Sequence, residues 1–372
     1  MRRRRLGALA ALAALAAVGG AAVGAGGEKD PGEPATALPP ACLGSDATAW
    51  GRLAGQRLIV RTDGTPDDTL LRRAKRGEIA GVIVFPSLGG SEAGIRRGLR
   101  RLQAAARAGG QAPLIVSTDQ EGGAVKRFPD GPPLLSPGQL AESGDRQDAR
   151  LEGRATGNFL SELGINTDLA PVLDVPASSA SVIATRAFGA DVESAAELGL
   201  FFADGLTRQG VLATAKHFPG LGRATLNTDF SPSEVTATRR EMARDLAPFE
   251  AAIADRLPLI MVALASYPEL GAKGPAALER SIATRLLRTQ LGFEGVSITD
   301  DLEAEAVAAR YDATEAAQRA AAAGMDLLLF ARGPAPGVLR RLERALASNR
   351  LDPEAARESC ARIVALREAL SP

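Results

Sequence analysis

The chain has 372 residues, in which 44 lysines and arginines balance 44 aspartates and glutamates. This balance argues against a nucleic-acid-binding protein, which needs a basic excess to contact phosphates. One histidine and two cysteines exclude a histidine-rich metal site, a zinc cluster and a disulfide scaffold. A hydrophobic content of 45% with 24% charged residues is typical of a globular protein.

Residues 1–25 have the features of a secretory signal peptide. Arg2–Arg5 precede an uncharged run, Leu6–Val23, and small residues surround Ala25. We therefore expect cleavage near Ala25 and a location outside the cytoplasm, secreted or in the cell envelope. The alternative is an uncleaved anchor, because the run is almost long enough to span a bilayer. In that case the membrane is contacted through this segment alone.

The segment 26–48 is rich in glycine and proline and is predicted to be a linker before a single catalytic domain over 49–372. Cys42 and Cys360 lie near opposite ends of the mature chain. In an oxidising compartment they can form a disulfide that ties the two ends together, and the alternative is two free thiols.

Short apolar runs alternate with longer amphipathic segments from residue 50 onward. The runs predicted as strands are Arg57–Val60, Ile79–Phe85, Pro113–Thr118, Ile165–Val175, Val211–Phe218, Leu259–Ala265, Gly295–Thr299 and Met325–Phe330. Helices are predicted between them, for example over Glu92–Arg107, Arg150–Leu163, Glu193–Gln209, Arg240–Ala254, Ile282–Gln290 and Ala313–Ala323. This alternation predicts an α/β fold, a (β/α)8 barrel, with a doubly wound open sheet as the alternative.

Charged residues end four of these strands. They are Asp119, Asp174, Lys216 with His217, and Asp300 with Asp301. The carboxyl ends of barrel strands meet on one face, where substrates bind. We therefore expect a shared site there, against the alternative that these residues only cap strand ends.

Three segments resemble glycoside hydrolase family 3. They are Asp119–Phe128 (DQEGGAVKRF), Lys216–Gly222 (KHFPGLG) and Gly292–Leu302 (GFEGVSITDDL), supported by Ala170–Val175 and Arg186–Gly189. Within that family they are most similar to the single-domain bacterial β-N-acetylglucosaminidases that trim peptidoglycan fragments. The resemblance covers about residues 50–370 and implies a barrel catalytic domain, a carbohydrate substrate, no metal and no organic cofactor. We also expect a monomer.

The resemblance implies a role for each matching residue. Asp300 is the nucleophile, which attacks the anomeric carbon and forms a glycosyl-enzyme, so that stereochemistry is retained. The residues that match sugar-hydroxyl ligands are Asp119, Arg127, Arg186, Lys216 and His217. Asp174 matches an acid that lines the site, without an assigned role.

The chain departs from the family in the loop after the Lys-His motif. Members usually carry Asp-Ser-His there, in which the histidine protonates the leaving oxygen. The corresponding positions are Asn227, Thr228 and Asp229, and the single histidine of the chain is His217. We expect Asp229 to be the acid/base, or Glu234 if the loop register is shifted.

The expected function is hydrolysis of non-reducing terminal β-linked N-acetylglucosamine from peptidoglycan-derived fragments. Two alternatives stay open. One is a β-glucosidase-like activity of the same family. The other is a secreted sugar-binding pseudoenzyme, because loss of acid/base assistance slows turnover by about 10²–10⁴-fold without abolishing recognition.

Residues near these motifs carry weaker signals. Asp301 and Glu303 are expected in the first turn of a helix, with a paired-carboxylate metal site as the alternative. Glu121 is expected in a loop beside the glycines, with a catalytic role as the alternative. Trp50 is expected to pack against the barrel, with sugar stacking as the alternative.

Overall fold

The computed structural model describes residues 38–87, 90–333 and 335–370. The expected signal peptide and residues 26–37 of the expected linker lie outside these ranges. Within the described residues, no helix combines the length and the apolar character that crossing a membrane requires.

Eight parallel strands form one sheet in the order β10-β1-β2-β3-β6-β7-β8-β9. Their bounds are Leu58–Thr62 (β1), Gly81–Val84 (β2), Ile115–Thr118 (β3), Thr167–Asp168 (β6), Leu212–Phe218 (β7), Leu259–Val262 (β8), Val296–Thr299 (β9) and Leu328–Phe330 (β10). A parallel bridge between Ile298 and Leu327 joins the ends of the sheet. The predicted (β/α)8 barrel is confirmed, and the open sheet is excluded.

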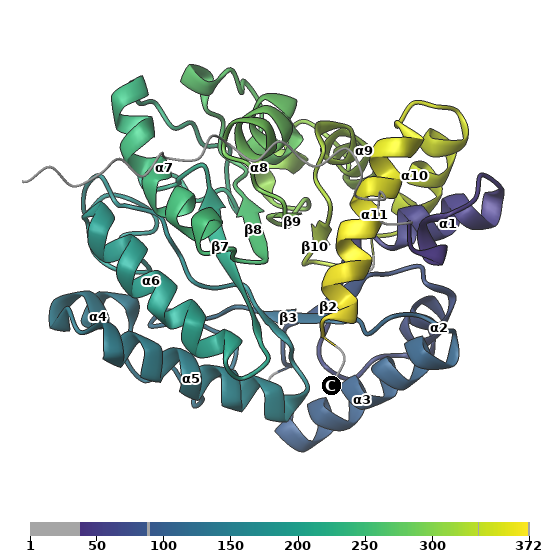
Figure 1. Ribbon diagram of the computed structural model, residues 1–372, viewed down its shortest axis with the longest axis horizontal. Coiled ribbons are helices and arrows are strands. Elements are labelled where there is room, and N and C mark those ends of the chain that lie inside the picture. The colour runs from purple at the N-terminus through teal and green to yellow at the C-terminus, as the bar shows by residue number, and fades with distance from the viewer. Residues whose placement is uncertain (1–37, 88–89, 334, 371–372) are drawn as a thin grey trace, which may run out of the picture. The chain divides into compact units, whose positions relative to one another are not determined.

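The helices surround the strands (Figure 1). Those that follow barrel strands are α2 (Asp68–Arg76), α3 (Glu92–Ala108), α5 (Arg146–Leu163), α6 (Val192–Thr207), α7 (Arg239–Ala254), the π-helix η4 (Ser281–Gln290), α9 (Ala313–Ala323), α10 (Val338–Ala347) and α11 (Pro353–Glu368). Shorter helices are α4 (Pro137–Ser143) and α8 (Glu305–Ala308). Most of the helices have an N-cap residue whose side chain accepts a hydrogen bond from a first-turn N–H. Examples are Ser91, Asp191 and Thr238.

Alternate residues of a strand enter different apolar clusters. Leu58 and Val60 of β1 pack toward the helices, whereas Ile59 joins the smaller cluster that includes Ile83, Met261 and Ile298. A strand buried on both faces reads as a continuous apolar run, which is why the runs were recognisable in the sequence.

The predicted strand over Ile165–Val175 is much shorter in the structure. Only Thr167–Asp168 pairs as a strand, followed by an isolated bridge between Val172 and Lys216. Pro171 lies between these two pairings and has no backbone N–H to donate to a neighbouring strand.

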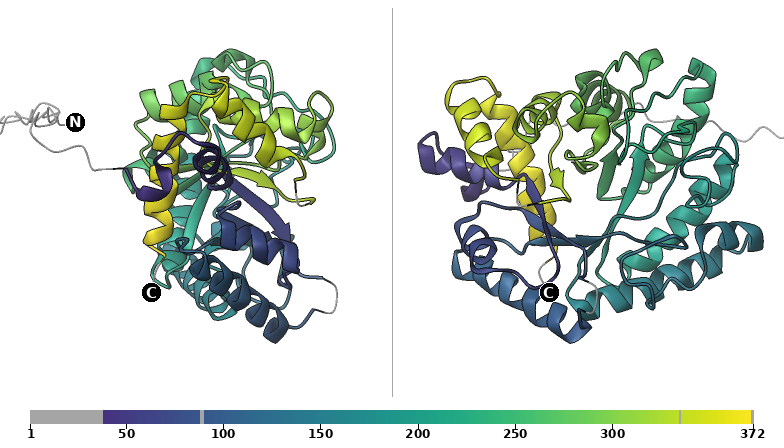
Figure 2. Two further views of the ribbon diagram at one scale, coloured as in Figure 1. Left: turned by 90° about the vertical axis from the view of Figure 1, so that its right-hand side faces the viewer. Right: turned by 180° about the vertical axis from the view of Figure 1, so that it is seen from behind.

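The folded domain begins before the expected boundary at residue 49. Cys42 lies in the short helix η1 (Pro40–Cys42), is fully buried, and forms a disulfide with Cys360 of α11. The helix α1 (Ala47–Gly55) then packs against α10 and α11 (Figure 2). The end of the expected linker is therefore part of the domain. Trp50 packs against the core, as expected, and its ring lies beneath the guanidinium of Arg357.

Candidate active site

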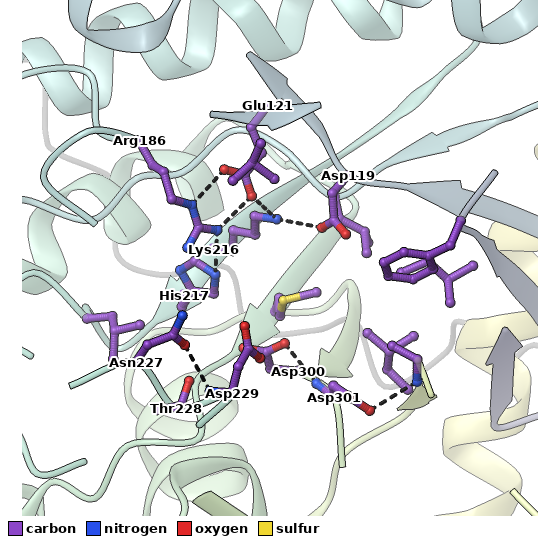
Figure 3. A pocket seen from close by; sticks show the side chains of 18 of the residues that line it. Asp119, Glu121, Arg186, Lys216, His217, Asn227, Thr228, Asp229, Asp300 and Asp301 are labelled. Carbon is purple, nitrogen blue, oxygen red and sulfur yellow. Dashed lines mark hydrogen bonds and ion pairs between the residues drawn. The ribbon is translucent and has the colours of Figure 1, made fainter. Parts of the chain in front are cut away.

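A pocket of about 460 Å³ lies at the carboxyl ends of the barrel strands (Figure 3). Asp119 follows β3, Lys216 and His217 belong to β7, and Asp300 follows β9. The seven residues for which the sequence analysis expected a catalytic or sugar-binding role all line this pocket: Asp119, Arg127, Arg186, Lys216, His217, Asp229 and Asp300. Glu234, the alternative acid, does not line it; its side chain is exposed outside the pocket, and its backbone bridges to Ser266.

Lys216 lies between two carboxylates at one side of the pocket. Its Nζ is 2.9 Å from Asp119 Oδ1 and 2.5 Å from Glu121 Oε1, and its side chain is 2% exposed. Burial alone would lower the pKa of Lys216, but Asp119 and Glu121 outweigh that effect and raise it. The ammonium group is therefore charged and fixed in position.

Asp119 also binds Arg127, whose Nη2 lies 3.0 Å from Oδ2. Burial would raise the pKa of Asp119, yet Lys216 and Arg127 hold it well below its ordinary value. The Arg127 guanidinium in turn stacks 4.3 Å from the ring centroid of Phe85, which positions it over the pocket.

Glu121 lies in the short strand β4 (Gln120–Gly122) and lines the pocket, whereas the sequence interpretation favoured a role in a loop. Arg186 donates to it through Nε at 2.8 Å and through Nη2 at 2.7 Å, and this pairing is bidentate. Burial opposes its charge, but Lys216 and Arg186 lower the pKa of Glu121 to about 2. The sequence did contain a signal for Glu121. It lies two residues after Asp119, and residues two apart in an extended segment face the same side.

Asp174 holds the imidazole of His217 and does not line the pocket. Its Oδ2 lies 2.7 Å from His217 Nδ1, and its Oδ1 accepts the Leu221 N–H at 2.6 Å. His217 Nε2 lies 3.4 Å from Nη2 of Arg186, which is a donor. A proton on Nδ1 and an acceptor at Nε2 satisfy both contacts. The expected site-lining role of Asp174 is therefore wrong, since the residue is fully buried behind His217.

Asp229 and Asp300 face each other across from the charged cluster (Figure 3). Burial of the carboxyl group and the charge of Asp300 raise the pKa of Asp229 above its ordinary value. The carbonyl oxygen of Asp229 accepts hydrogen bonds from Arg332 Nη2 at 2.9 Å and from the Glu305 N–H at 3.3 Å. The loop is thus tied to the barrel at two points.

Asp301 and Glu303 hold the loop after β10 and are not in a helix, contrary to expectation. Asp301 Oδ1 accepts the Ala331 N–H at 3.0 Å, and Glu303 Oε2 accepts the Arg332 N–H at 2.9 Å. Burial raises the pKa of Asp301 to about 6. Among the described residues, no group of three or more His, Cys, Asp or Glu side chains is placed to hold a metal ion.

The chain is similar to known glycosidases over most of its length. The model of the glycosyl hydrolase family 3 N-terminal domain matches residues 56–366. A relative described as an uncharacterized secreted glycosyl hydrolase of Arthroderma benhamiae is 36% identical over 86% of this chain and 93% of the relative. The beta-hexosaminidase LpqI of Mycobacterium tuberculosis is 34% identical over 70% of this chain and 69% of its own length.

The fold is also similar to that of solved glycosidase structures. A family 3 β-N-acetylglucosaminidase from Paenibacillus sp. FPU-7 superposes with a TM-score of 0.82 at 31% identity. The match covers 86% of this chain and 62% of that longer one. A β-N-acetylhexosaminidase from Beutenbergia cavernae superposes with a TM-score of 0.77 at 29% identity, covering 86% of this chain and 98% of the other. The chain therefore belongs to glycosyl hydrolase family 3.

Proposed function

We propose that the protein is a retaining β-N-acetylglucosaminidase in which Asp300 is the nucleophile and Asp229 is the acid/base. The observation that carries this proposal is the pairing of two carboxyl groups in one pocket, opposite a cluster of fixed charges. A retaining glycosidase needs one carboxylate to attack and one carboxylic acid to protonate the leaving oxygen.

The environments of the two carboxyl groups support this division of roles. The raised pKa of Asp229 favours the protonated form that an acid catalyst needs. Asp300 Oδ1 accepts the Asp301 N–H at 2.8 Å, and this contact fixes the orientation of the carboxyl group that is proposed to attack. In the second step Asp229, now ionised, accepts a proton from the attacking water.

The charged cluster supports binding of a sugar ring in front of Asp300. Asp119, Lys216 and Arg186 offer acceptors and donors whose positions are fixed by buried ion pairs. Hydrogen bonds to sugar hydroxyls that strengthen as the ring distorts toward the transition state accelerate the reaction. The names of the relatives favour N-acetylglucosamine over glucose as that sugar.

We also propose a cellular location and a natural substrate for this activity. The features of residues 1–25 and the name of the secreted Arthroderma relative support action outside the cytoplasm. The substrates there would be β-linked N-acetylglucosamine at the non-reducing ends of peptidoglycan fragments, cleaved by a monomer without a metal or organic cofactor.

Trapping with azide tests the two carboxylates separately. The substrate is 2,4-dinitrophenyl β-N-acetylglucosaminide, whose leaving group needs no proton. With azide, Asp229→Ala should form the β-glycosyl azide by two displacements, and Asp300→Ala should form the α-glycosyl azide by one. The same azide from both variants would contradict the assignment. The parent enzyme is also tested with 2,4-dinitrophenyl β-glucoside. Release of dinitrophenol from the glucoside alone would show that glucose is the sugar recognised. Release from neither substrate would establish the pseudoenzyme.

A further inference from the structure

The side chain that follows the proposed acid is an exposed aromatic ring at the pocket. Phe230 lines the pocket and is 77% exposed. Burying a phenyl ring is worth about 1.5–3 kcal/mol relative to leaving it exposed, so this position gains nothing from folding. A ring held at a pocket rim without packing against the protein is available to a ligand.

The backbone that carries this ring is well fixed. The Phe230 N–H donates to the Asn227 carbonyl at 3.1 Å, and the neighbouring Thr228 carbonyl accepts the Ala306 N–H at 3.0 Å. Arg332 holds the carbonyl of Asp229. Because the turn is anchored on both α8 and Arg332, the ring is presented from a rigid support.

Of the residues that the structure describes, two phenylalanines line the pocket, and only Phe230 has a free face. The ring of Phe85 is covered by Arg127 at 4.3 Å and by Arg61 at 4.7 Å from its centroid. A sugar that stacks on an aromatic ring in this pocket therefore has Phe230 as its platform.

The position of Phe230 identifies which sugar this is. An acid/base residue lies on the leaving-group side of the glycosidic bond, because it protonates the bridging oxygen. Phe230 is its chain neighbour and lies on the pocket surface with it. We propose that Phe230 stacks against the sugar ring of the leaving group, and so favours substrates whose departing group is a second pyranose.

This inference rests on the proposed function. It also applies to transglycosylation, in which the glycosyl-enzyme reacts with a sugar hydroxyl instead of water. In that step an acceptor hydroxyl attacks the anomeric carbon, the ester bond to Asp300 breaks, and the hydroxyl proton passes to Asp229. Water reacts through the same base. Phe230 should favour a sugar acceptor over water without affecting the base.

Binding to an inactive background provides the first test. Asp300→Ala protein should bind N,N′-diacetylchitobiose more tightly than N-acetylglucosamine by calorimetry. Adding Phe230→Ala should raise the Kd of the disaccharide about tenfold and change the Kd of the monosaccharide less than twofold. Phe230→Trp should keep the difference. Leu226→Ala is the matched control, because Leu226 is 53% exposed on the same loop and does not line the pocket.

The second test measures partition. N-acetylglucosaminyl β-fluoride with a ¹³C-labelled sugar is supplied with unlabelled N-acetylglucosamine as acceptor, and the ratio of labelled disaccharide to labelled free sugar is measured. Phe230→Ala should lower this ratio about tenfold and Leu226→Ala should not. Loss of both products in proportion would mean that Phe230 positions Asp229, and would overturn the inference. If Asp300→Ala binds neither sugar, the proposed function fails first. If it binds both and Phe230→Ala changes nothing, only the inference fails.

Discussion

Glu121 receives two hydrogen bonds from the guanidinium of Arg186, at 2.8 and 2.7 Å, and its side chain is only 1% exposed. The same carboxylate lies 2.5 Å from Lys216 Nζ. One buried anion therefore fixes two cations that are proposed to bind sugar hydroxyls. Its removal should affect both stability and catalysis.

Glu121→Gln should lower the free energy of unfolding by about 3–5 kcal/mol, because it breaks the ion pair of Arg186 and leaves the buried Lys216 with one carboxylate, Asp119, instead of two. The value of kcat/KM should fall as well, since Lys216 and Arg186 lose their shared anchor. Glu197→Gln is the control, because Glu197 pairs with Arg146 through side chains that are 43% and 58% exposed. That change should cost less than about 1 kcal/mol. Equal losses in denaturant unfolding would refute the special role of Glu121.

The contribution of Glu121 to stability should depend on pH. Its pKa is lowered from 4.5 to about 2 on folding, so the stabilisation is complete above the unfolded pKa and is lost as pH falls toward 2. The difference in unfolding free energy between the parent protein and Glu121→Gln should therefore shrink from pH 4.5 downward. Denaturant titrations between pH 2.5 and 6 measure this difference, and a constant value would contradict the prediction.

The sequence predicted the barrel because its strands are buried on both faces, and continuous apolar runs such as Val211–Phe218 stand out. Motifs also identified Asp119, Lys216 and Asp300, which adjoin those runs. The role of Asp174 escaped prediction because a strand end can face the pocket or the layer behind it. Phe230 escaped because a single exposed ring has no sequence pattern. These positions depend on how loops fold over the barrel rim.

The pH profile should identify Asp229 as the acid. Its carboxyl must be protonated for the first step, so kcat/KM on N,N′-diacetylchitobiose should fall as pH rises through its pKa, which burial and Asp300 raise above 3.8. With N-acetylglucosaminyl β-fluoride, whose leaving group needs no proton, this limb should be absent. Asp229→Ala should lose the limb on the disaccharide as well. A basic limb of the same shape on both substrates would assign it to another group.

The disulfide between Cys42 and Cys360 closes a sequence separation of 318 residues. Removing it should lower the free energy of unfolding by about 2–5 kcal/mol, because an unfolded chain without the cross-link loses more conformational entropy when it folds. Activity at 25 °C should be unchanged, since neither cysteine lines the pocket. Thermal unfolding of the Cys42→Ser/Cys360→Ser variant and its kcat/KM test the two halves of this prediction. A fall in activity without a fall in Tm would contradict it.

The carboxylate at position 229 should also decide which acceptor resolves the glycosyl-enzyme. Once Asp229 has given up its proton, its negative charge repels phosphate, and two like charges 4 Å apart at a protein surface cost about 4 kcal/mol before neighbouring cations are counted. The parent enzyme should therefore hydrolyse the substrate and form little sugar 1-phosphate. In Asp229→Ala the repulsion is removed while Arg186 and Arg332 remain to attract the anion. With 2,4-dinitrophenyl β-N-acetylglucosaminide and phosphate, that variant should form N-acetylglucosamine 1-phosphate. Phosphate-dependent product from the parent enzyme, detected by ³¹P NMR, would show that Asp229 does not exclude this acceptor.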